Sequence, residues 1–325
     1  MLQKEQSLVL LLLLASVAFG FAQNQPPVAL NLDLKPPFKF VAYGDIRFAR
    51  PDDKNASDFA RRTALVQRIA EENPAFVTIS GDLVVAGDEK NWRFWDKETQ
   101  LWREKNILVL PALGNHDVRG GDAALANYFD RFPDLKQSRW YTARAGNVLL
   151  VALDSTGDGV REAQLEWLKK QLDTIPSGVE FVIFNLHHPP YTRSTDSWLG
   201  GGHSARSSEQ RLGKMLEARQ ANTPARFIVF SGHVHNYERY EHGGVTYIVT
   251  GGGGARPYEV PREAGDHYTE EGPTYHYCVL EVDRGKLRLS MQKLEIDDVG
   301  KPRFTEGDSF EVTVKAAEAE AASLR

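Results

Sequence analysis

The chain has 325 residues, 42% of them hydrophobic and 26% charged, with a formal net charge of -5 at pH 7. This is the composition of an ordinary globular protein, long enough for one large domain or two small ones. The mildly acidic balance argues against a protein that binds nucleic acid through a broad basic face, and no such face is evident in the sequence.

The first 22 residues predict a signal peptide. Lys4 precedes an apolar run from Leu8 to about Ala22, and small residues at Ala18 and Gly20, or at Gly20 and Ala22, suit a signal-peptidase site. This run is shorter than the roughly 20 residues that span a bilayer, which leaves an uncleaved anchor as the alternative. We therefore expect an exported protein without a stable membrane anchor, periplasmic or secreted if the source is bacterial.

The rest of the chain predicts a linker, one domain and a tail. Residues 23–37 are Pro-rich and predict the linker, residues 38–314 predict the domain, and the Ala/Glu-rich residues 315–325 predict a flexible tail. Cys278 is the only cysteine, so an intrachain disulfide cannot form.

Within the domain, short apolar runs alternate with longer segments of helical periodicity. The runs that predict strands or hairpins lie at 38–45, 75–82, 107–117, 147–155, 180–190, 225–235, 246–254 and 277–295. The segments that predict helices lie at 57–73, 88–106, 162–172 and 207–218. This alternation predicts parallel strands at the core of an α/β fold, and the hairpins after Tyr237 predict an added antiparallel portion.

Two of these helices carry specific expectations. Ser57 is the expected N-cap of the helix at 57–73. Trp92, Trp95 and Trp102 fall roughly on one face of the helix at 88–106, and we interpret this stripe as core packing rather than a ligand platform.

Side chains that can bind a metal follow five of the apolar runs directly. These residues are Asp45, Asp82, Asn115, His187, and the pair His233 and His235. Glycine precedes four of the five positions and lets the backbone turn sharply and approach an ion closely. In open α/β sheets the reactive groups gather beyond the carboxyl ends of the strands. One such ending is expected of a solvated loop, but five in one chain predict a shared metal site.

The types of these side chains indicate the kind of metal site. Two carboxylates, one amide oxygen and three imidazoles suit Mn, Fe or Zn. Six ligands are too many for one catalytic zinc and suit two ions, about 3.5–4 Å apart, that share a bridging carboxylate. Two divalent ions carry +4 and two aspartates remove 2, so a charge of about +2 remains to hold a hydroxide and a phosphoryl group.

The motifs GDIR, GDLVVAG, GNHD, NLHHPPY and GHVHNYER occur in this order between Gly44 and Arg239. This combination resembles the calcineurin-like metallophosphoesterases, and within them the purple-acid-phosphatase-like branch. The resemblance implies two facing mixed β-sheets flanked by helices, a four-layer αββα sandwich with a dinuclear centre at the shared edge. It implies Asp45 and His235 as ligands of one metal, Asn115, His187 and His233 as ligands of the other, and Asp82 as the bridge.

The resemblance also implies a reaction. His116 matches the residue that contacts the substrate and donates a proton to the leaving group, with Asp117 orienting it. A metal-bound hydroxide would be the nucleophile. The expected function is hydrolysis of a phosphate ester, whether a small molecule or a macromolecule.

Two positions depart from the family pattern. Arg47 stands where many members have a histidine, and because arginine stays protonated it cannot be a ligand. The first metal would therefore have fewer protein ligands. Val85 stands where the purple enzymes have a ligand tyrosine, so we expect no tyrosinate–iron colour. Arg47 either forks onto a substrate phosphate or pairs with Asp52 or Asp53.

Two further histidines lie near these motifs. His203 lies in a glycine-rich loop, where it either binds phosphate or belongs to a plain surface loop. His188 follows His187 directly and would point the opposite way on a strand, so we expect a supporting or packed residue.

Two other classes of function stay open. A non-catalytic phosphate- or polyanion-binding module with a degraded metal site would explain Arg47, and a surface interaction protein would use the metals only for stability. Among enzymes, a phosphomonoesterase is slightly favoured over a phosphodiesterase, because Arg47 adds positive charge for a dianion.

Overall fold

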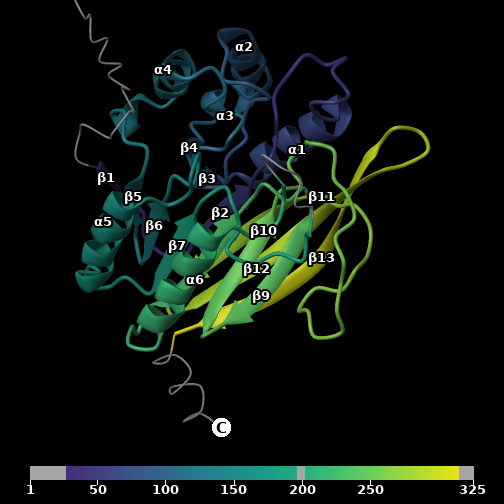
Figure 1. Ribbon diagram of the computed structural model, residues 1–325. Coiled ribbons are helices and arrows are strands. Elements are labelled where there is room, and N and C mark those ends of the chain that lie inside the picture. The colour runs from purple at the N-terminus through teal and green to yellow at the C-terminus, as the bar shows by residue number, and fades with distance from the viewer. Residues whose placement is uncertain (1–26, 196–201, 315–325) are drawn as a thin grey trace, which may run out of the picture.

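The computed structural model describes residues 27–195 and 202–314, which form two β-sheets lying face to face with helices on the outer sides (Figure 1). In spatial order, the seven-stranded sheet consists of β1 (Ala29–Leu32), β5 (Tyr141–Ala145), β6 (Val148–Ala152), β7 (Phe181–Asn185), β8 (Arg226–Ser231), β10 (Val245–Thr250) and β9 (Tyr237–His242). The six-stranded sheet consists of β13 (Pro302–Thr313), β12 (Lys286–Ile296), β11 (Tyr275–Asp283), β2 (Phe38–Tyr43), β3 (Phe76–Ile79) and β4 (Leu108–Pro111).

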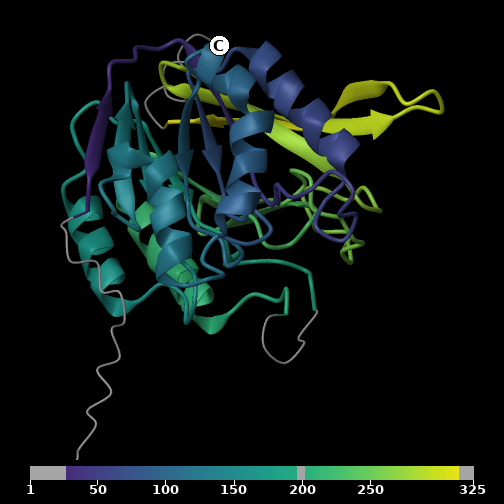
Figure 2. The ribbon, with the colours of Figure 1, turned by 90° about the horizontal axis from the view of Figure 1, so that it is seen from above.

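Helices cover both outer faces. They are α1 (Phe59–Glu72), α2 (Glu89–Glu98), α3 (Gln100–Glu104), α4 (Asp122–Arg131), the 3-10 helix η1 (Pro133–Leu135), α5 (Glu162–Asp173) and α6 (Ser207–Gln220). Helix α1 lies along the C-terminal strands of the six-stranded sheet (Figure 2), whereas α6 lies against β8 and β10 of the other sheet. The expected α/β class with two facing mixed sheets and flanking helices is confirmed.

Strand directions follow the predicted pattern. The strands β2, β3 and β4 are parallel, as are β6, β7, β8 and β10. The chain after Gly272 adds the antiparallel strands β11, β12 and β13, and β11 joins the sheet beside β2 with Cys278 opposite Ala42. Each parallel group therefore directs the carboxyl ends of its strands toward one edge.

Alternation of side chains along the seven-stranded sheet separates two cores. In β7, Ile183 packs in the core between the two sheets, while Val182 and Phe184 pack with α5 and α6. This is the period of two expected for a strand buried on both faces. Leu165 and Leu168 of α5 are buried in this outer core.

The expected linker at 23–37 contains a strand, so the boundary at Phe38 is corrected. Strand β1 pairs in parallel with β5, Ala29 opposite Thr142. Leu30 and Leu32 pack against the core between the sheets, in the alternation typical of a strand. The prolines on either side obscured that pattern. The predicted signal peptide and tail lie outside the described residues.

The tryptophan-rich segment forms two helices instead of the one predicted. Thr99 ends α2 and begins α3, and its hydroxyl donates a hydrogen bond to the carbonyl of Trp95 (2.6 Å). A threonine side chain that binds the backbone in this way competes with regular helix geometry. Trp92, Trp95 and Trp102 are buried, as the core-packing interpretation requires.

The N-cap of α1 is Asp58 rather than Ser57. The Asp58 carboxylate accepts a hydrogen bond from the backbone amide of Arg61 (3.0 Å), whereas the hydroxyl of Ser57 donates to the carbonyl of Arg47 (2.9 Å). Within residues 27–195 and 202–314, no helix has the length and apolar character needed to cross a membrane.

Candidate metal centre

The six predicted ligands lie together where the two sheets meet. Strands β2, β3 and β4 of one sheet lead into Asp45, Asp82 and Asn115, and β7 and β8 of the other lead into the histidines. One ligand atom from each of Asp45, Asp82 and His187 lies within 4.8 Å of the others. Residues far apart in sequence therefore form one buried cluster.

Backbone geometry explains the glycines before these ligands. Three of the ligands adopt left-handed backbone conformations, which residues other than glycine rarely do. They are Asp45 (φ 56°), Asp82 (φ 54°) and His233 (φ 69°). A side chain at Gly114 would collide with the backbone of Asp82, and one at Gly232 would collide with the carboxylate of Asp45. These two glycines serve close approach between loops, and strained ligand backbones of this kind are typical of functional sites.

Four side chains present acceptor atoms to one another in a first group. The ring Nε2 of His187 lies 2.8 Å from Asn115 Oδ1, 3.2 Å from His233 Nδ1 and 3.4 Å from Asp82 Oδ1. His187 Nδ1 lies 2.8 Å from the carbonyl of Ser80 and must donate to it, so Nε2 is the ring nitrogen available to a cation. Lone pairs that converge in this way suit a cation between them. We call these four residues the four-donor group.

Asp45 and His235 form a second group. His235 Nε2 lies 3.4 Å from Asp45 Oδ1, and both atoms are buried without a hydrogen-bond partner. The other ring nitrogen of His235 lies 3.0 Å from the carbonyl of Arg256 and donates to it, so Nε2 again presents a lone pair. Two buried acceptors that face each other are unfavourable unless a proton or a metal ion lies between them. We call these two residues the two-donor group.

Burial and neighbouring charges shift the titration of these groups. Burial raises the pKa of Asp45 to about 7, against the lowering effect of His187. Burial also lowers the pKa of His235 to about 3, with a further contribution from Arg47, so this ring is neutral, as a ligand must be. Burial tends to raise the pKa of Asp82, but His187, Arg47 and His116 outweigh it and hold that pKa well below its usual value.

Together, the two groups fit the predicted ions. Their six side chains contain carboxylate, amide and imidazole donors, which suit Mn, Fe or Zn. Hydrogen bonds to the backbone fix the rings of His187 and His235, as is usual for metal-binding histidines. Asp82 and His187 lie close to both groups.

His116 lies beside this cluster as expected, but Asp117 does not orient it. The His116 ring donates through Nδ1 to the carbonyl of Val85 (2.7 Å), and its Nε2 lies 3.8 Å from Asp82 Oδ2. Burial lowers the pKa of His116 to about 4, while Asp82 raises it. The Asp117 carboxylate instead accepts backbone hydrogen bonds from Gly114 (2.8 Å) and Val84 (3.1 Å). Asp117 therefore ties two ligand loops together.

Arg47 contacts neither of the partners expected from its own loop. Its Nε and Nη2 donate to Asp82 Oδ2 at 3.1 and 3.0 Å, while Asp52 pairs with Arg50. The guanidinium is largely buried, with 14% of the side chain exposed. Arg47 therefore lies on the predicted bridging carboxylate.

His203 lies at the rim of the cluster, as its proposed substrate contact requires. Its ring centre lies 4.9 Å from that of His233 and 5.1 Å from that of Tyr258. A cavity of about 330 Å³ opens beside it, lined by Ser194, Thr195, His203, Tyr258, Glu259 and Pro261. Arg193 donates a hydrogen bond to Asp266 (2.8 Å). This bond links the segment of Ser194 and Thr195 to the loop that contains Tyr258, Glu259 and Pro261.

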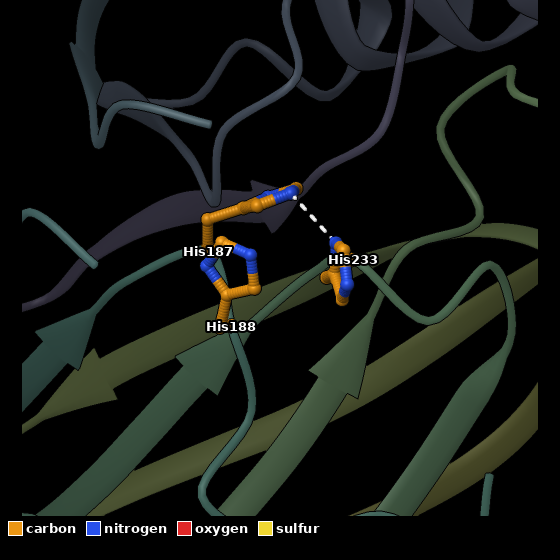
Figure 3. Close-up of side chains that lie close together, drawn as sticks. All are labelled: His187, His188 and His233. Atoms are coloured by element: carbon orange, nitrogen blue, oxygen red, sulfur yellow. Dashed lines mark hydrogen bonds between the residues drawn. The ribbon is translucent and has the colours of Figure 1, made fainter. Parts of the chain in front are cut away.

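His188 does not point away from its neighbour. Its ring lies 4.8 Å from that of His187 and 4.2 Å from that of His233, and the three point toward one another (Figure 3). Strand β7 ends at Asn185, so the alternation of a strand does not apply to His188. Its Nδ1 lies 3.1 Å from the hydroxyl of Ser155, a partner that sequence analysis missed.

Two facing mixed sheets with buried carboxylate and imidazole donors and a partly buried amide beyond the ends of their strands define an α/β protein with a candidate metal centre. The model for the calcineurin-like phosphoesterase family matches residues 38–237. The chain belongs to that family.

Similar proteins are plant phosphatases. Purple acid phosphatase 15 of Arabidopsis thaliana is 26% identical over 185 residues, which cover 52% of this chain and 33% of that protein. Purple acid phosphatase 23 of the same plant is 24% identical over 234 residues, covering 59% of this chain and 49% of that protein. The chain thus spans between a third and a half of the length of these relatives.

A solved structure shares the fold of this chain. The purple acid phosphatase PPD1 from yellow lupin (Lupinus luteus) superposes with a TM-score of 0.64 at 20% sequence identity, covering 86% of this chain and 54% of that one. This likeness confirms the fold, and the two plant relatives support the expected purple-acid-phosphatase-like branch.

Addition of Mn²⁺ or Zn²⁺ should stabilise the protein against unfolding, because a cation would satisfy the buried acceptors of Asp45 and His235. An ion that binds only the folded state at a hundred times its Kd adds about 2.7 kcal/mol to the free energy of unfolding. Thermal melts across a metal titration measure this, with excess chelator as the control. A melting temperature that does not change with metal concentration would contradict the metal site.

Proposed function

We propose that the protein hydrolyses phosphate esters at a dinuclear metal centre. The observation that carries this proposal is the pair of acceptor groups: Asp45 Oδ1 and His235 Nε2 are buried without a hydrogen-bond partner, and three further atoms, from Asn115, His233 and Asp82, converge on His187 Nε2. Two ions bound there would supply Lewis-acid activation of the ester and of the attacking water. The cofactors are thus two ions of Mn, Fe or Zn.

The side chains around the centre have separate roles in this proposal. His116 contacts the substrate and protonates the leaving oxygen, since its Nε2 lies beside Asp82 and its other nitrogen is held by the carbonyl of Val85. Asp117 holds the loops of His116 and Asp82 in register through backbone hydrogen bonds. His203 contacts a phosphate oxygen or the leaving group at the cavity of about 330 Å³.

A phosphomonoester is the favoured substrate. The names of the relatives support a phosphatase, since two are purple acid phosphatases and a third is a phosphoenolpyruvate phosphatase of Allium cepa. This third relative is 22% identical, and the match covers 43% of its length. The cavity beside His203 is bounded by two loops and suits one small leaving group. A diester would place a second substituent on the phosphate and needs a more open cleft.

Export through a cleaved signal peptide at residues 1–22 remains part of the proposal, and it would place the enzyme in the periplasm or outside the cell of a bacterium. N-terminal sequencing of the mature protein tests this. An N-terminus that still carries Met1 would contradict cleavage.

Purified protein loaded with metal should turn over p-nitrophenyl phosphate with a higher kcat/KM than bis-p-nitrophenyl phosphate at matched pH. A tenfold preference for the diester, about 1.4 kcal/mol in transition-state binding, would overturn the monoester assignment. Phosphate binding without turnover of either ester would instead support the non-catalytic module. The observation that favours this alternative is the contact of Arg47 with Asp82.

A further inference from the structure

The backbone of Arg47 is fixed at the edge of the cluster. Its amide donates to the carbonyl of Asp82 (2.9 Å), and its carbonyl accepts from the hydroxyl of Ser57 (2.9 Å). The residue adopts a left-handed conformation with φ 53°, and its guanidinium reaches the carboxylate of Asp82. The two backbone hydrogen bonds therefore hold Arg47 at a position from which its guanidinium can bind Asp82.

The contact with Arg47 reduces the number of acceptor sites that Asp82 can offer to a metal ion. A carboxylate offers about two acceptor sites on each oxygen. Oδ2 accepts two donors from Arg47, at 3.1 and 3.0 Å, so both of its sites are taken. Oδ1 accepts one hydrogen bond, from the backbone amide of His116 (2.9 Å), so one site remains. That oxygen is the one that lies 3.4 Å from His187 Nε2.

The two donor groups therefore differ in what Asp82 can give them. The four-donor group includes the open site on Asp82 Oδ1 together with Asn115, His187 and His233. The two-donor group has only Asp45 Oδ1 and His235 Nε2 while Arg47 occupies Oδ2. In addition, a permanently charged guanidinium repels a cation in the same largely buried space.

We propose that Arg47 is a positioning residue that makes the two metal ions bind with unequal affinity. The four-donor group fills first. The two-donor group fills only when the guanidinium leaves Asp82 Oδ2, so that an oxygen becomes available to a second ion. This inference rests on the proposed dinuclear site and concerns the order in which its two halves fill.

Metal titration of the wild-type protein and an Arg47→Met variant tests the proposal. Methionine keeps the aliphatic stem but removes the charge and the donors, and both backbone hydrogen bonds of residue 47 can form as before. Titration of metal-free protein with Mn²⁺ or Zn²⁺, followed by calorimetry, gives the two affinities, and elemental analysis after dialysis gives the number of ions retained.

We expect the wild-type protein to bind one ion at least about tenfold more tightly than the second, and the variant to bind the second ion at least about tenfold more tightly than the wild type does. The first affinity should change by less than about threefold. Arg47→Lys keeps a charge but not the fork, so its second affinity should fall between those of the other two proteins.

The matched control is Arg50→Met, which removes an arginine of the same loop that pairs with Asp52 at the surface. It should leave both affinities unchanged. Equal affinities in the wild type, or a second affinity that is the same in all four proteins, would overturn the role of Arg47. Neither result depends on turnover, so a failure of this inference is distinct from a failure of the proposed hydrolase activity.

Discussion

Replacing Asp82 with alanine should remove most of the bound metal from the purified protein. Asp82 is fully buried. Its Oδ1 lies 3.4 Å from His187 Nε2, and its Oδ2 lies 3.8 Å from His116 Nε2 and accepts hydrogen bonds from Arg47. Loss of an outer partner of a ligand already weakens metal binding by about 10–100-fold, and loss of a carboxylate that lies near both groups should cost more. Elemental analysis after dialysis measures the loss, and turnover should fall with it.

Two further variants separate metal loss from unfolding. Alanine leaves the largely buried Arg47 without its anion, which typically destabilises a protein by about 3–5 kcal/mol. Asp82→Asn retains one carbonyl oxygen for Arg47 and should fold better while still losing metal. Asp52→Ala removes an exposed aspartate that pairs with Arg50 and should change neither property. Asp82 variants that retain two ions per chain after dialysis would contradict the assignment of this residue.

The sequence was sufficient to predict the fold class and the clustering of these six side chains for one physical reason. Apolar runs long enough to be buried strands ended repeatedly in side chains that bind metals, and strand ends of parallel sheets converge. Asp45, Asp82 and Asn115 follow strands of one sheet, and His187 and His233 follow strands of the other. That the two sheets share this edge came from the family resemblance and not from any pattern of the residues.

Errors arose where a side chain has a partner that is distant in sequence or belongs to the backbone. Arg47 was expected to pair with an aspartate of its own loop or with substrate, but it binds Asp82, 35 residues away. Asp117 was expected to orient His116, but it binds backbone amides, and a backbone carbonyl holds the ring instead. Backbone partners leave no signature in a sequence, because every residue has the same amide and carbonyl.

Two predictions about local structure were wrong because a general rule was applied where tertiary contacts override it. Strand alternation was extended to His188, although β7 ends at Asn185 and the chain then bends. The strand β1 was missed because its flanking prolines outweighed the alternation of Leu30 and Leu32. Tertiary contacts determine the structure in both cases. The hydroxyl of Ser155 holds the ring of His188, and pairing with β5 makes residues 29–32 a strand.

Replacing His116 with asparagine should lower kcat by about 10²–10⁴-fold, the usual contribution of a general acid, while the bound metal stays. The backbone amide of residue 116 that donates to Asp82 Oδ1 is unaffected by the substitution. The asparagine amide can also donate to the carbonyl of Val85, as the ring does. What is lost is Nε2, the atom that would carry the proton to the leaving oxygen.

The dependence on leaving group distinguishes proton donation from simple phosphate binding. An alkyl phosphate releases a strongly basic alkoxide that needs a proton, whereas p-nitrophenyl phosphate releases a phenolate that needs little help. The loss of kcat in His116→Asn should therefore be at least about tenfold larger for the alkyl ester, a difference of about 1.4 kcal/mol in the barrier. His267→Asn, at an exposed histidine of the loop 255–275, is the matched control and should leave both rates unchanged. Equal losses for the two esters would assign His116 to phosphate binding alone, and loss of the metals would make it a ligand.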